Sequence, residues 1–261
     1  METTRVVWEL RDEIGIITLN RPDRLNALDS RTLDEFNHLA EHAWNDPSVR
    51  CLLITGSGRG FCAGADVKEW SSSDDGAAHE DNWVLKMHRL MTRLYRMPKP
   101  VIAAVNGVAV GAGFDLTLVA DLRIASASAR FGMAYVNIGF CPDAGGSYLL
   151  PRLIGPARAT ELIFTGRMID APDANAIGLL NAMVEPDDLM DTAMEWASRL
   201  ANGPTVAIGL AKENIRQNLH LSFEDALRNE RRAGEVCGAT EDHKEGLAAL
   251  SEKRPPQFRG R

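Results

Sequence analysis

Two carboxylates near the middle of the chain are placed for acid–base chemistry. Asp115 follows the glycine-rich segment 107–113, and Asp143 lies in the loop 140–146. The apolar run 101–105 predicts a strand, so the chain passes from a strand through a glycine-rich turn into a helix. Such a turn leaves backbone N–H groups unpaired, and these can bind an oxygen that becomes negative during a reaction. Unpaired donors beside carboxylates indicate proton transfer next to a carbonyl group.

We expect the two carboxylates to differ as bases. Asp115 falls in the first turn of a helix expected over 114–120, where the helix dipole should keep it ionised and weakly basic. Asp143 has apolar and small neighbours in its loop, and the loss of solvent there should make it the stronger base. Each also has a simpler interpretation, because Asp115 can serve only the helix dipole and Pro-Asp-Ala-Gly is a favourable turn sequence.

Alternating strands and helices must hold these residues in place. Short apolar runs predict strands buried on both faces, and apolar residues three or four apart predict helices. A membrane helix over 101–120 is disfavoured because Asn106 and Asp115 lie inside it. Helix caps are expected at Asp29 or Ser30, Asp170, Ser222 and Asp242. The expected strands cover 6–10, 14–19, 49–55 and 101–105, the expected helices 30–44, 83–95, 114–120, 156–165, 171–178 and 205–219, and a polar loop 71–80.

Composition limits the classes of protein to which the chain can belong. Of its 261 residues 45% are hydrophobic, which is ordinary for a globular protein with a sizeable core. A net charge of -7 argues against general nucleic-acid binding. The four cysteines form no C-x-x-C pair, and the N-terminus lacks the basic-then-apolar form of a signal peptide. These features predict a cytoplasmic protein with reduced thiols and no membrane partner.

Other candidate motifs favour ordinary structural roles. The Gly-Ser-Gly-Arg-Gly run at 56–60 lacks the spacing of dinucleotide-binding and P-loop motifs. His38 and His42 share a helix face but lack the H-E-x-x-H pattern, so no metal site is predicted. Cys62 and Cys141 are interpreted as small packed residues rather than nucleophiles.

Three longer motifs carry a resemblance to a known family. The stretches PVIAAVNGVAVGAGFDL, FCAGADVKEW and GFCPDAGGSYLLPRLIGPARATELIFTGRMIDA resemble the crotonase family of enoyl-CoA hydratases and isomerases. The likeness runs in order from Asn20-Arg21-Pro22 to the closing EKRPPQF. It implies an α/β fold with a spiral of ββα units over 1–190, and a helical segment 191–261 that forms homotrimers or homohexamers. It also implies an acyl-CoA thioester substrate and no cofactor other than the coenzyme A of that substrate.

The resemblance further assigns positions in the site. In this family two backbone N–H groups hold the thioester oxygen, and by motif they fall on Ala65 and Ala112. Two of the coenzyme A positions lie in a tail that reaches the coenzyme A of a neighbouring subunit, Lys253 and Phe258. The remaining coenzyme A positions are matched by Arg24, Ala27, Ala63, Asp66 and Val67.

The chain departs from the family pattern at the carboxylates. Hydratases of the family use two glutamates, which would stand at Asp115 and Tyr135. Aspartate is shorter by roughly 1.5 Å, and a phenol with a pKa near 10 is a poor base. Asp143 matches the position of the base in several enoyl-CoA isomerases, including the ring-isomerising enzymes of phenylacetate breakdown. We therefore expect an isomerase with Asp143 as base and with Tyr135 and Phe140 in the acyl pocket.

Three alternatives to the isomerase stay open. The first is an enoyl-CoA hydratase in which Asp115 acts through an ordered water. The second is an RNA-binding member of the family, against which the acidic balance counts, and the third is a catalytically silent scaffold. A salt-dependent shift of RNA would support the second, and acyl-CoA binding without turnover the third.

Overall fold

The computed structural model describes the backbone of residues 4–66 and 76–261, and the side chains of 4–66 and 82–261. Its strands form two sheets, a six-stranded one in the order β1-β2-β3-β5-β7-β10 and a four-stranded one in the order β4-β6-β8-β9. The first sheet consists of β1 (Val6–Arg11), β2 (Ile14–Leu19), β3 (Cys51–Gly56), β5 (Val101–Val105), β7 (Leu122–Ser126) and β10 (Ala182–Val184). The second consists of β4 (Gly60–Cys62), β6 (Val108–Val110), β8 (Arg130–Gly132) and β9 (Met168–Asp170).

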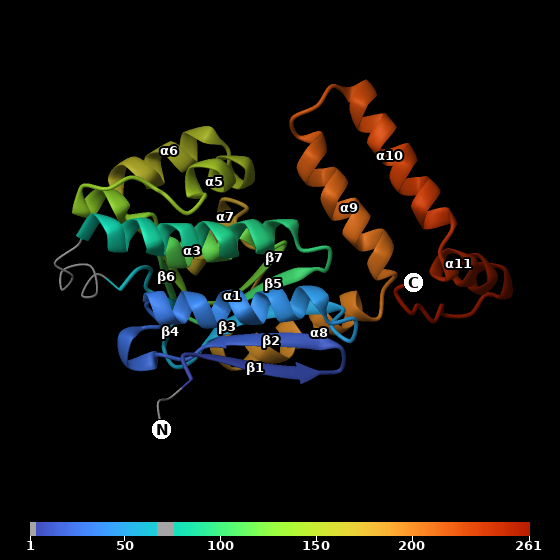
Figure 1. Cartoon of the computed structure of the whole chain (residues 1–261), viewed down its shortest axis with the longest axis horizontal. Helices are drawn as coiled ribbons and strands as arrows, with labels where there is room; N and C mark the ends of the chain where they lie inside the picture. Colours follow the sequence, from blue (N-terminus) through green and yellow to red (C-terminus); the bar gives the residue numbers. More distant parts are fainter. Residues whose placement is uncertain (1–3, 67–75) are drawn as a thin grey trace.

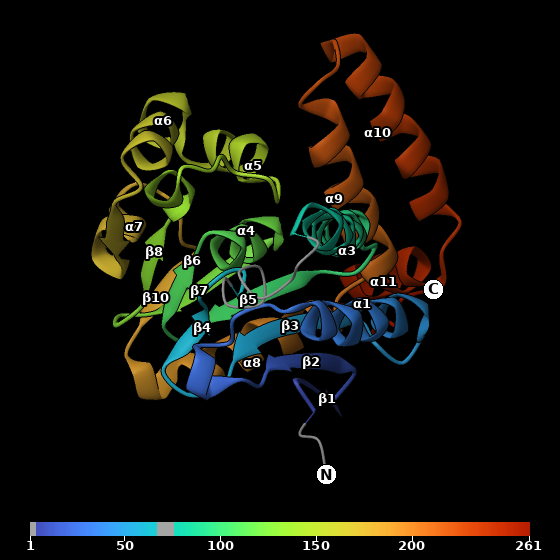
Figure 2. The same ribbon diagram turned by 60° about the vertical axis from the view of Figure 1, so that its left-hand side comes forward.

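Helices cover the six-stranded sheet on both faces (Figures 1 and 2). α1 (Ser30–Asn45) and α3 (Gly76–Arg96) lie side by side on one face, and α8 (Leu189–Ala201) packs on the other. Every residue of β5 is buried, and its side chains alternate between the two faces. Ile102 and Ala104 pack with α8, whereas Val101 and Ala103 pack with the core under α1 and α3. The prediction of a strand buried on both faces is therefore confirmed.

A repeated unit of two strands and a helix links the two sheets. β3, β5 and β7 pair in parallel, and the strands that follow them, β4, β6 and β8, pair in parallel in the same order. A helix follows each pair, namely α3 after β4, α4 (Ala112–Val119) after β6 and α5 (Gly146–Ile154) after β8 and the short helix η2 (Ala134–Ile138). This repetition confirms the predicted α/β fold with a spiral of ββα units.

Short helices complete the body of the molecule. They cover the ends of the strands and carry the chain between successive units. They are η1 (Pro22–Arg24), α6 (Pro156–Thr165), α7 (Ala171–Ala176) and η3 (Pro186–Asp188). No helix in the described residues combines the length and the apolar character needed to span a membrane.

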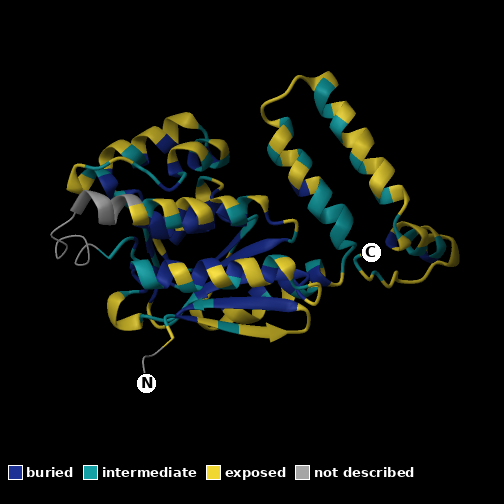
Figure 3. Ribbon diagram, in the orientation of Figure 1, coloured by how far each residue is buried: buried dark blue, intermediate teal, exposed yellow. Residues whose placement is uncertain are grey.

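After α8 the chain continues into α9 (Thr205–Asn218), which is tied to the body because its Lys212 and Arg216 both bind Asp121. α9 and α10 (Phe223–Gly238) pack against each other as a projecting pair, and α11 (Glu241–Glu252) follows (Figures 1 and 3). α10 has no buried residue. The sequence-based boundary lies at 190, and α8 still packs on the sheet, so α9 is the first helix to leave it. Large apolar side chains are exposed on the pair and its connection, namely Ile215, Leu219, Leu221, Phe223, Leu227 and Val236.

Two local predictions need correction. Caps at Asp29, Asp170 and Ser222 are confirmed, because each accepts the backbone N–H three residues further on. The cap at Asp242 is wrong, since Thr240 caps α11 and Asp242 instead accepts the backbone N–H groups of Arg259 (2.6 Å) and Gly260 (2.8 Å). The polar loop 71–80 is wrong from Gly76 onward, where α3 begins, and residues 67–75 lie outside the described residues.

Candidate active site

The start of α4 forms one wall of the site. Gly111 ends β6 with a φ of +53°, a conformation that L-side chains rarely adopt, and its N–H donates to Gly132 O at 2.9 Å. Ala112 is the first helical residue, and no side chain among the described residues caps this helix. Its N–H is therefore one of the donors that a helix start leaves available. A Cβ added to Gly111 would lie 3.7 Å from the ring of Tyr135, so the phenol packs directly beside the turn.

The loop that carries Ala65 forms the second wall. Leu28 N–H donates to Gly64 O (2.8 Å), and Asp66 N–H donates to Leu28 O (3.0 Å). In this parallel bridge Leu28 pairs with Ala65, so the N–H of Ala65 points to the opposite side. The residue before Ala65 lies against the start of α4, because a Cβ added to Gly64 would lie 3.6 Å from Ala112 N. The structure thus brings the predicted donors Ala65 and Ala112 together from segments far apart in the sequence.

Asp115 and Tyr135 form the innermost part of the site. Asp115 is fully buried, and the Tyr135 hydroxyl donates to its Oδ2 at 2.5 Å. Burial raises the pKa of Asp115 to about 7, with the Tyr135 hydrogen bond lowering it and the charge of Asp143 raising it further. The expectation of a weakly basic Asp115 is therefore wrong, because loss of solvent outweighs the dipole of an eight-residue helix.

Asp143 lies against the same phenol from the loop before α5. Burial raises the pKa of Tyr135 above its usual range, and the charges and hydrogen bonds of Asp115 and Asp143 raise it further. The phenol is consequently a permanent donor between two carboxylates. The backbone O of Asp143 also contacts His88 Nε2 at 2.6 Å, and since a carbonyl can only accept, Nε2 must carry the hydrogen. The side chain of Asp143 is half-buried, whereas that of Asp115 has no exposure.

Apolar side chains surround these polar groups. A Cβ added to Gly145 would lie 3.9 Å from Met91 Cε and 3.8 Å from Leu149 Cδ1. Phe140 is half-buried and packs against the main core, and Tyr135 is 8% exposed. Their place in the acyl pocket stays a prediction. Burial raises the pKa of the Cys62 thiol to about 12, which makes it a packed thiol and not a nucleophile.

The positions assigned to coenzyme A fall in three environments. Ala63, in the segment that carries Ala65, donates its N–H to Leu25 O at 2.9 Å, and Ala27 is buried in the segment that pairs with it. Arg24 is half-exposed at the end of η1. Asp66 does not present a free carboxylate, because its Oδ2 accepts from Arg21 Nη2 at 2.9 Å. Val67 lies outside the described residues.

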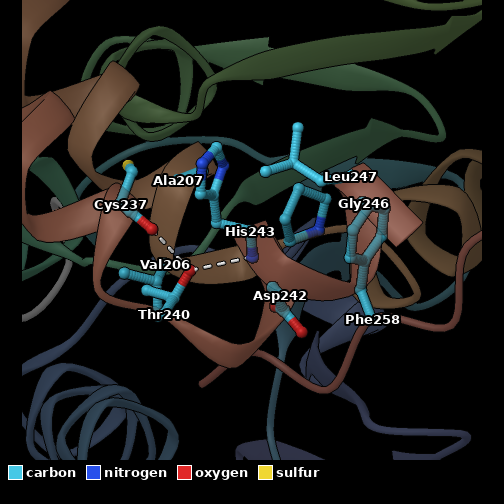
Figure 4. Close-up of a pocket in the computed structure, with 10 residues that line it drawn as sticks. Val206, Ala207, Cys237, Thr240, Asp242, His243, Gly246, Leu247 and Phe258 are labelled. Atoms are coloured by element: carbon cyan, nitrogen blue, oxygen red, sulfur yellow. Dashed lines mark hydrogen bonds between the residues drawn. The ribbon is translucent and has the colours of Figure 1, made fainter. Parts of the chain in front are cut away.

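Lys253 and Phe258 are not brought to this site within one chain. Both belong to the C-terminal region, which lies at one side of the molecule, whereas α4 lies near its middle (Figure 2). Phe258 packs beside Gly246 and lines a pocket of about 220 Å³ with Val206 and Leu247 (Figure 4). Their predicted role, at the coenzyme A of a neighbouring subunit, stays a prediction.

Comparison with known proteins places the chain in a family. Residues 9–261 match the sequence model of the family described as Enoyl-CoA hydratase/isomerase. The chain belongs to this family. The short-chain-enoyl-CoA hydratase of Clostridium acetobutylicum is 39% identical over 255 residues, which cover 97% of each chain. The 1,2-epoxyphenylacetyl-CoA isomerase of Escherichia coli is 40% identical over 247 residues, which cover 94% of each chain.

Solved structures agree with this assignment. The crystal structure of an enoyl-CoA hydratase from Bacillus anthracis matches with a TM-score of 0.94 at 35% identity, covering 99% of this chain and 100% of that one. The protein is therefore an enzyme of the crotonase family, as the three sequence motifs predict. Relatives with hydratase and isomerase names match the chain at similar identity, so the names alone do not decide between hydration and isomerisation.

Two residues of the site were missed by sequence reasoning. His88 on α3 contacts the backbone of Asp143, and Arg21 binds the carboxylate of Asp66. His88 gives no sequence signal, because it lies in a helix among ordinary polar residues. Arg21 does give a sequence signal, since it belongs to Asn20-Arg21-Pro22, where the family resemblance begins. Within the described residues, no group of three or more His, Cys, Asp or Glu side chains is arranged to hold a metal ion.

Proposed function

We propose that this protein is an acyl-CoA isomerase that moves the double bond of an unsaturated acyl-CoA thioester, with Asp143 as the base. The observation that carries the proposal is the 2.5 Å hydrogen bond from Tyr135 to Asp115. It places a phenol against the buried carboxylate, at the position where the resemblance puts the second glutamate of a hydratase. Asp143, a half-buried residue, then carries the carboxylate of the group that is left to act as the base. The Escherichia coli relative is also named as an isomerase, although the substrate in its name is an epoxide.

The proposed reaction uses two backbone donors and one base. The N–H groups of Ala65 and Ala112 bind the thioester oxygen and stabilise the negative charge that develops on it. Asp143 removes a proton from a carbon conjugated to the thioester, and the electron pair of that C–H bond passes to the oxygen as an enolate. The enolate electrons then form a C–H bond at another carbon with the proton that Asp143 returns. Substrate and product have the same mass, and coenzyme A takes part only as a portion of the substrate.

Asp115 and Tyr135 complete the proposed site without acting as the base. Tyr135 stays protonated because its pKa is raised, so its single O–H donates to Asp115 and the phenol lies between the two carboxylates. Asp115 then keeps the phenol in place from the buried side. In this arrangement the position of Asp143 is fixed on its side chain by Tyr135 and on its backbone by His88.

Hydration is the second candidate reaction, and one observation favours it. The pKa of Asp115, at about 7, suits a group that gives and takes protons near neutral pH. The relatives also include named hydratases, such as that of Clostridium acetobutylicum. In this version Asp115 would act through an ordered water, and Tyr135 would orient that water. Neither RNA binding nor a silent scaffold gains support from the relatives, which carry enzyme names.

The test is a product analysis. The protein is incubated with a panel of β,γ- and α,β-unsaturated acyl-CoAs, and each product is identified by mass and double-bond position. An unchanged mass with a shifted double bond supports the isomerase, and a mass gain of one water supports the hydratase. Tight acyl-CoA binding without any turnover would contradict both.

We further propose that the exposed helices mediate the trimer that the resemblance implies. The apolar side chains of Leu227 and Val236 on α10 are about half exposed, and an oligomer would cover them. In a trimer Lys253 and Phe258 would reach the coenzyme A of a neighbour. A native mass equal to the 28.6 kDa of one chain would contradict this proposal.

A further inference from the structure

Arg21 lies between the two segments that build the Ala65 wall of the site. It lies two residues after Leu19, the last residue of β2, and its side chain is only 15% exposed. Its Nη1 donates to Ala27 O at 2.6 Å, and its Nη2 donates to Asp66 Oδ2 at 2.9 Å. The guanidinium therefore holds one segment by its backbone and the other by a carboxylate. Asp66 is itself nearly buried, with 13% of its side chain exposed.

The contacts of Arg21 lie next to Ala65, whose backbone N–H is one of the two proposed oxyanion donors. Ala65 precedes Asp66, and the backbone bonds of Leu28 to Gly64 and Asp66 fix the loop on both sides of it. A third backbone bond, from Ala63 N–H to Leu25 O at 2.9 Å, holds the loop before Gly64. The Arg21–Asp66 pair adds a side-chain restraint directly after Ala65. A planar guanidinium with two directed bonds restrains orientation as well as distance. Asp29 Oδ2 lies 3.2 Å from Arg21 Nη1, the nitrogen that also donates to Ala27 O, and adds a charged contact to the guanidinium.

We infer that Arg21 is a positioning residue for the oxyanion hole, acting through Asp66 to aim the N–H of Ala65 at the thioester oxygen. This inference rests on the proposed role of Ala65. It also extends the role of Asp66. With its carboxylate bound to Arg21, Asp66 has a role in the geometry of the amide besides the contact with coenzyme A that the resemblance assigns to it.

The experiment compares Arg21→Met and Asp66→Ala with the wild type. Misaiming one oxyanion donor should lower kcat by roughly 10- to 100-fold, short of the full loss of a donor. The dissociation constant for free coenzyme A, which has no thioester carbonyl, should change by less than about threefold. The double variant should be no slower than either single variant by more than about twofold, because both remove the same restraint. Arg11→Met, at an exposed arginine paired with Glu9, is the matched control and should leave kcat unchanged.

An infrared measurement separates positioning from general stability. The bound substrate carries ¹³C at the thioester carbonyl, and hydrogen bonds from the two amides should lower its stretching frequency. Arg21→Met and Asp66→Ala should each lose a large part of this lowering. A lower melting temperature with an unchanged carbonyl frequency would overturn the inference, and so would a loss of coenzyme A affinity with kcat retained. If Arg21→Met does not fold, Arg21→Lys and Asp66→Asn carry the same test with smaller expected effects.

The result can be distinguished from failure of the proposed function. An oxyanion hole serves hydration and double-bond migration alike, so these measurements are valid with whichever reaction the product analysis finds. If Ala112→Pro leaves the carbonyl frequency unchanged as well, the oxyanion hole itself is wrong. If Ala112→Pro changes the carbonyl frequency but the Arg21 variants leave it unchanged, Arg21 does not position Ala65.

Discussion

The hydroxyl of Tyr135 donates a 2.5 Å hydrogen bond to Oδ2 of Asp115, a carboxylate with no solvent exposure. The other oxygen of that carboxylate faces the start of α5, where a Cβ added to Gly146 would lie 2.2 Å from Oδ1. Among the described residues Oδ1 has no hydrogen-bond partner. A buried carboxylate with one donor is costly to ionise, and this explains the pKa near 7.

The raised pKa of Asp115 predicts a stability that falls as pH rises. Between its unfolded pKa of 3.8 and its folded pKa of about 7, the native state binds a proton that the unfolded state releases. The stabilisation is thus complete below the unfolded pKa and lost as pH rises through the folded one. Asp115→Asn cannot titrate, so from about pH 5 to about pH 8 the wild type should lose on the order of 3 kcal/mol of unfolding free energy relative to this variant.

Urea unfolding at both pH values measures this difference. Asp23→Asn changes a carboxylate that is 80% exposed and should reproduce the pH dependence of the wild type. Equal pH dependence in the wild type and Asp115→Asn would show that the pKa of Asp115 is not raised.

The backbone N–H of Ala112 can be removed by a substitution that the start of a helix tolerates. Proline is tolerated at the first position of a helix, which Ala112 occupies, and it lacks the N–H. Loss of one oxyanion donor typically costs roughly 10²–10³ in rate. We expect Ala112→Pro to lower turnover by that order while the affinity for free coenzyme A is kept. Ala112→Ser retains the N–H and should keep most activity, and full turnover by a folded Ala112→Pro would exclude this amide from the oxyanion hole.

Local patterns predicted the parts of the site that depend on local geometry. The apolar run of β5 is found where the sequence indicates, and the helix expected over 114–120 is found at Ala112–Val119, two residues earlier at its start. The same is true of the helix caps at Asp29 and Ser222, which depend on bonds within four residues. The pairing of Ala65 with Ala112 needed the family resemblance, because it joins different units of the spiral.

The electrostatics of the site could not be predicted in this way. The helix-dipole argument for Asp115 considered one helix, whereas its environment is set by Tyr135, 20 residues later, and by the start of α5. The pair of Arg21 and Asp66 spans 45 residues, and the contact of His88 with Asp143 spans 55. Burial is a tertiary property, so neither the basicity of a carboxylate nor its partners follow from its flanking residues.

His88 offers a test of how the loop of Asp143 is held. Its Nε2–H is a donor to the backbone O of Asp143, so His88→Leu removes the donor and should let the loop move. We expect kcat to fall by roughly tenfold with a smaller change in KM, because the base is misplaced and not removed. His88→Gln places an amide N–H near the same point and should restore most of kcat. Equal losses in the Leu and Gln variants would show that the hydrogen bond itself does not matter.

The two carboxylates are separated by replacing each with asparagine. Asparagine has nearly the shape of aspartate but cannot accept and return a proton. If Asp143 is the base, Asp143→Asn should abolish double-bond migration while acyl-CoA binding is kept. Asp115→Asn should slow the reaction less, because Tyr135 can still donate to the amide oxygen. Turnover and acyl-CoA affinity are measured for both variants on the substrate found by the product analysis.

Label exchange gives the same comparison a second readout. In deuterated water the wild type should introduce deuterium at the α or γ carbon of the acyl chain, because a carboxylic acid exchanges its proton with solvent. Asp143→Asn should introduce none, whereas Asp115→Asn should still exchange. The opposite pattern, in which Asp115→Asn is inactive and Asp143→Asn still exchanges label, would make Asp115 the base. Its pKa of about 7 would then serve catalysis directly, and hydration would become the better-supported reaction.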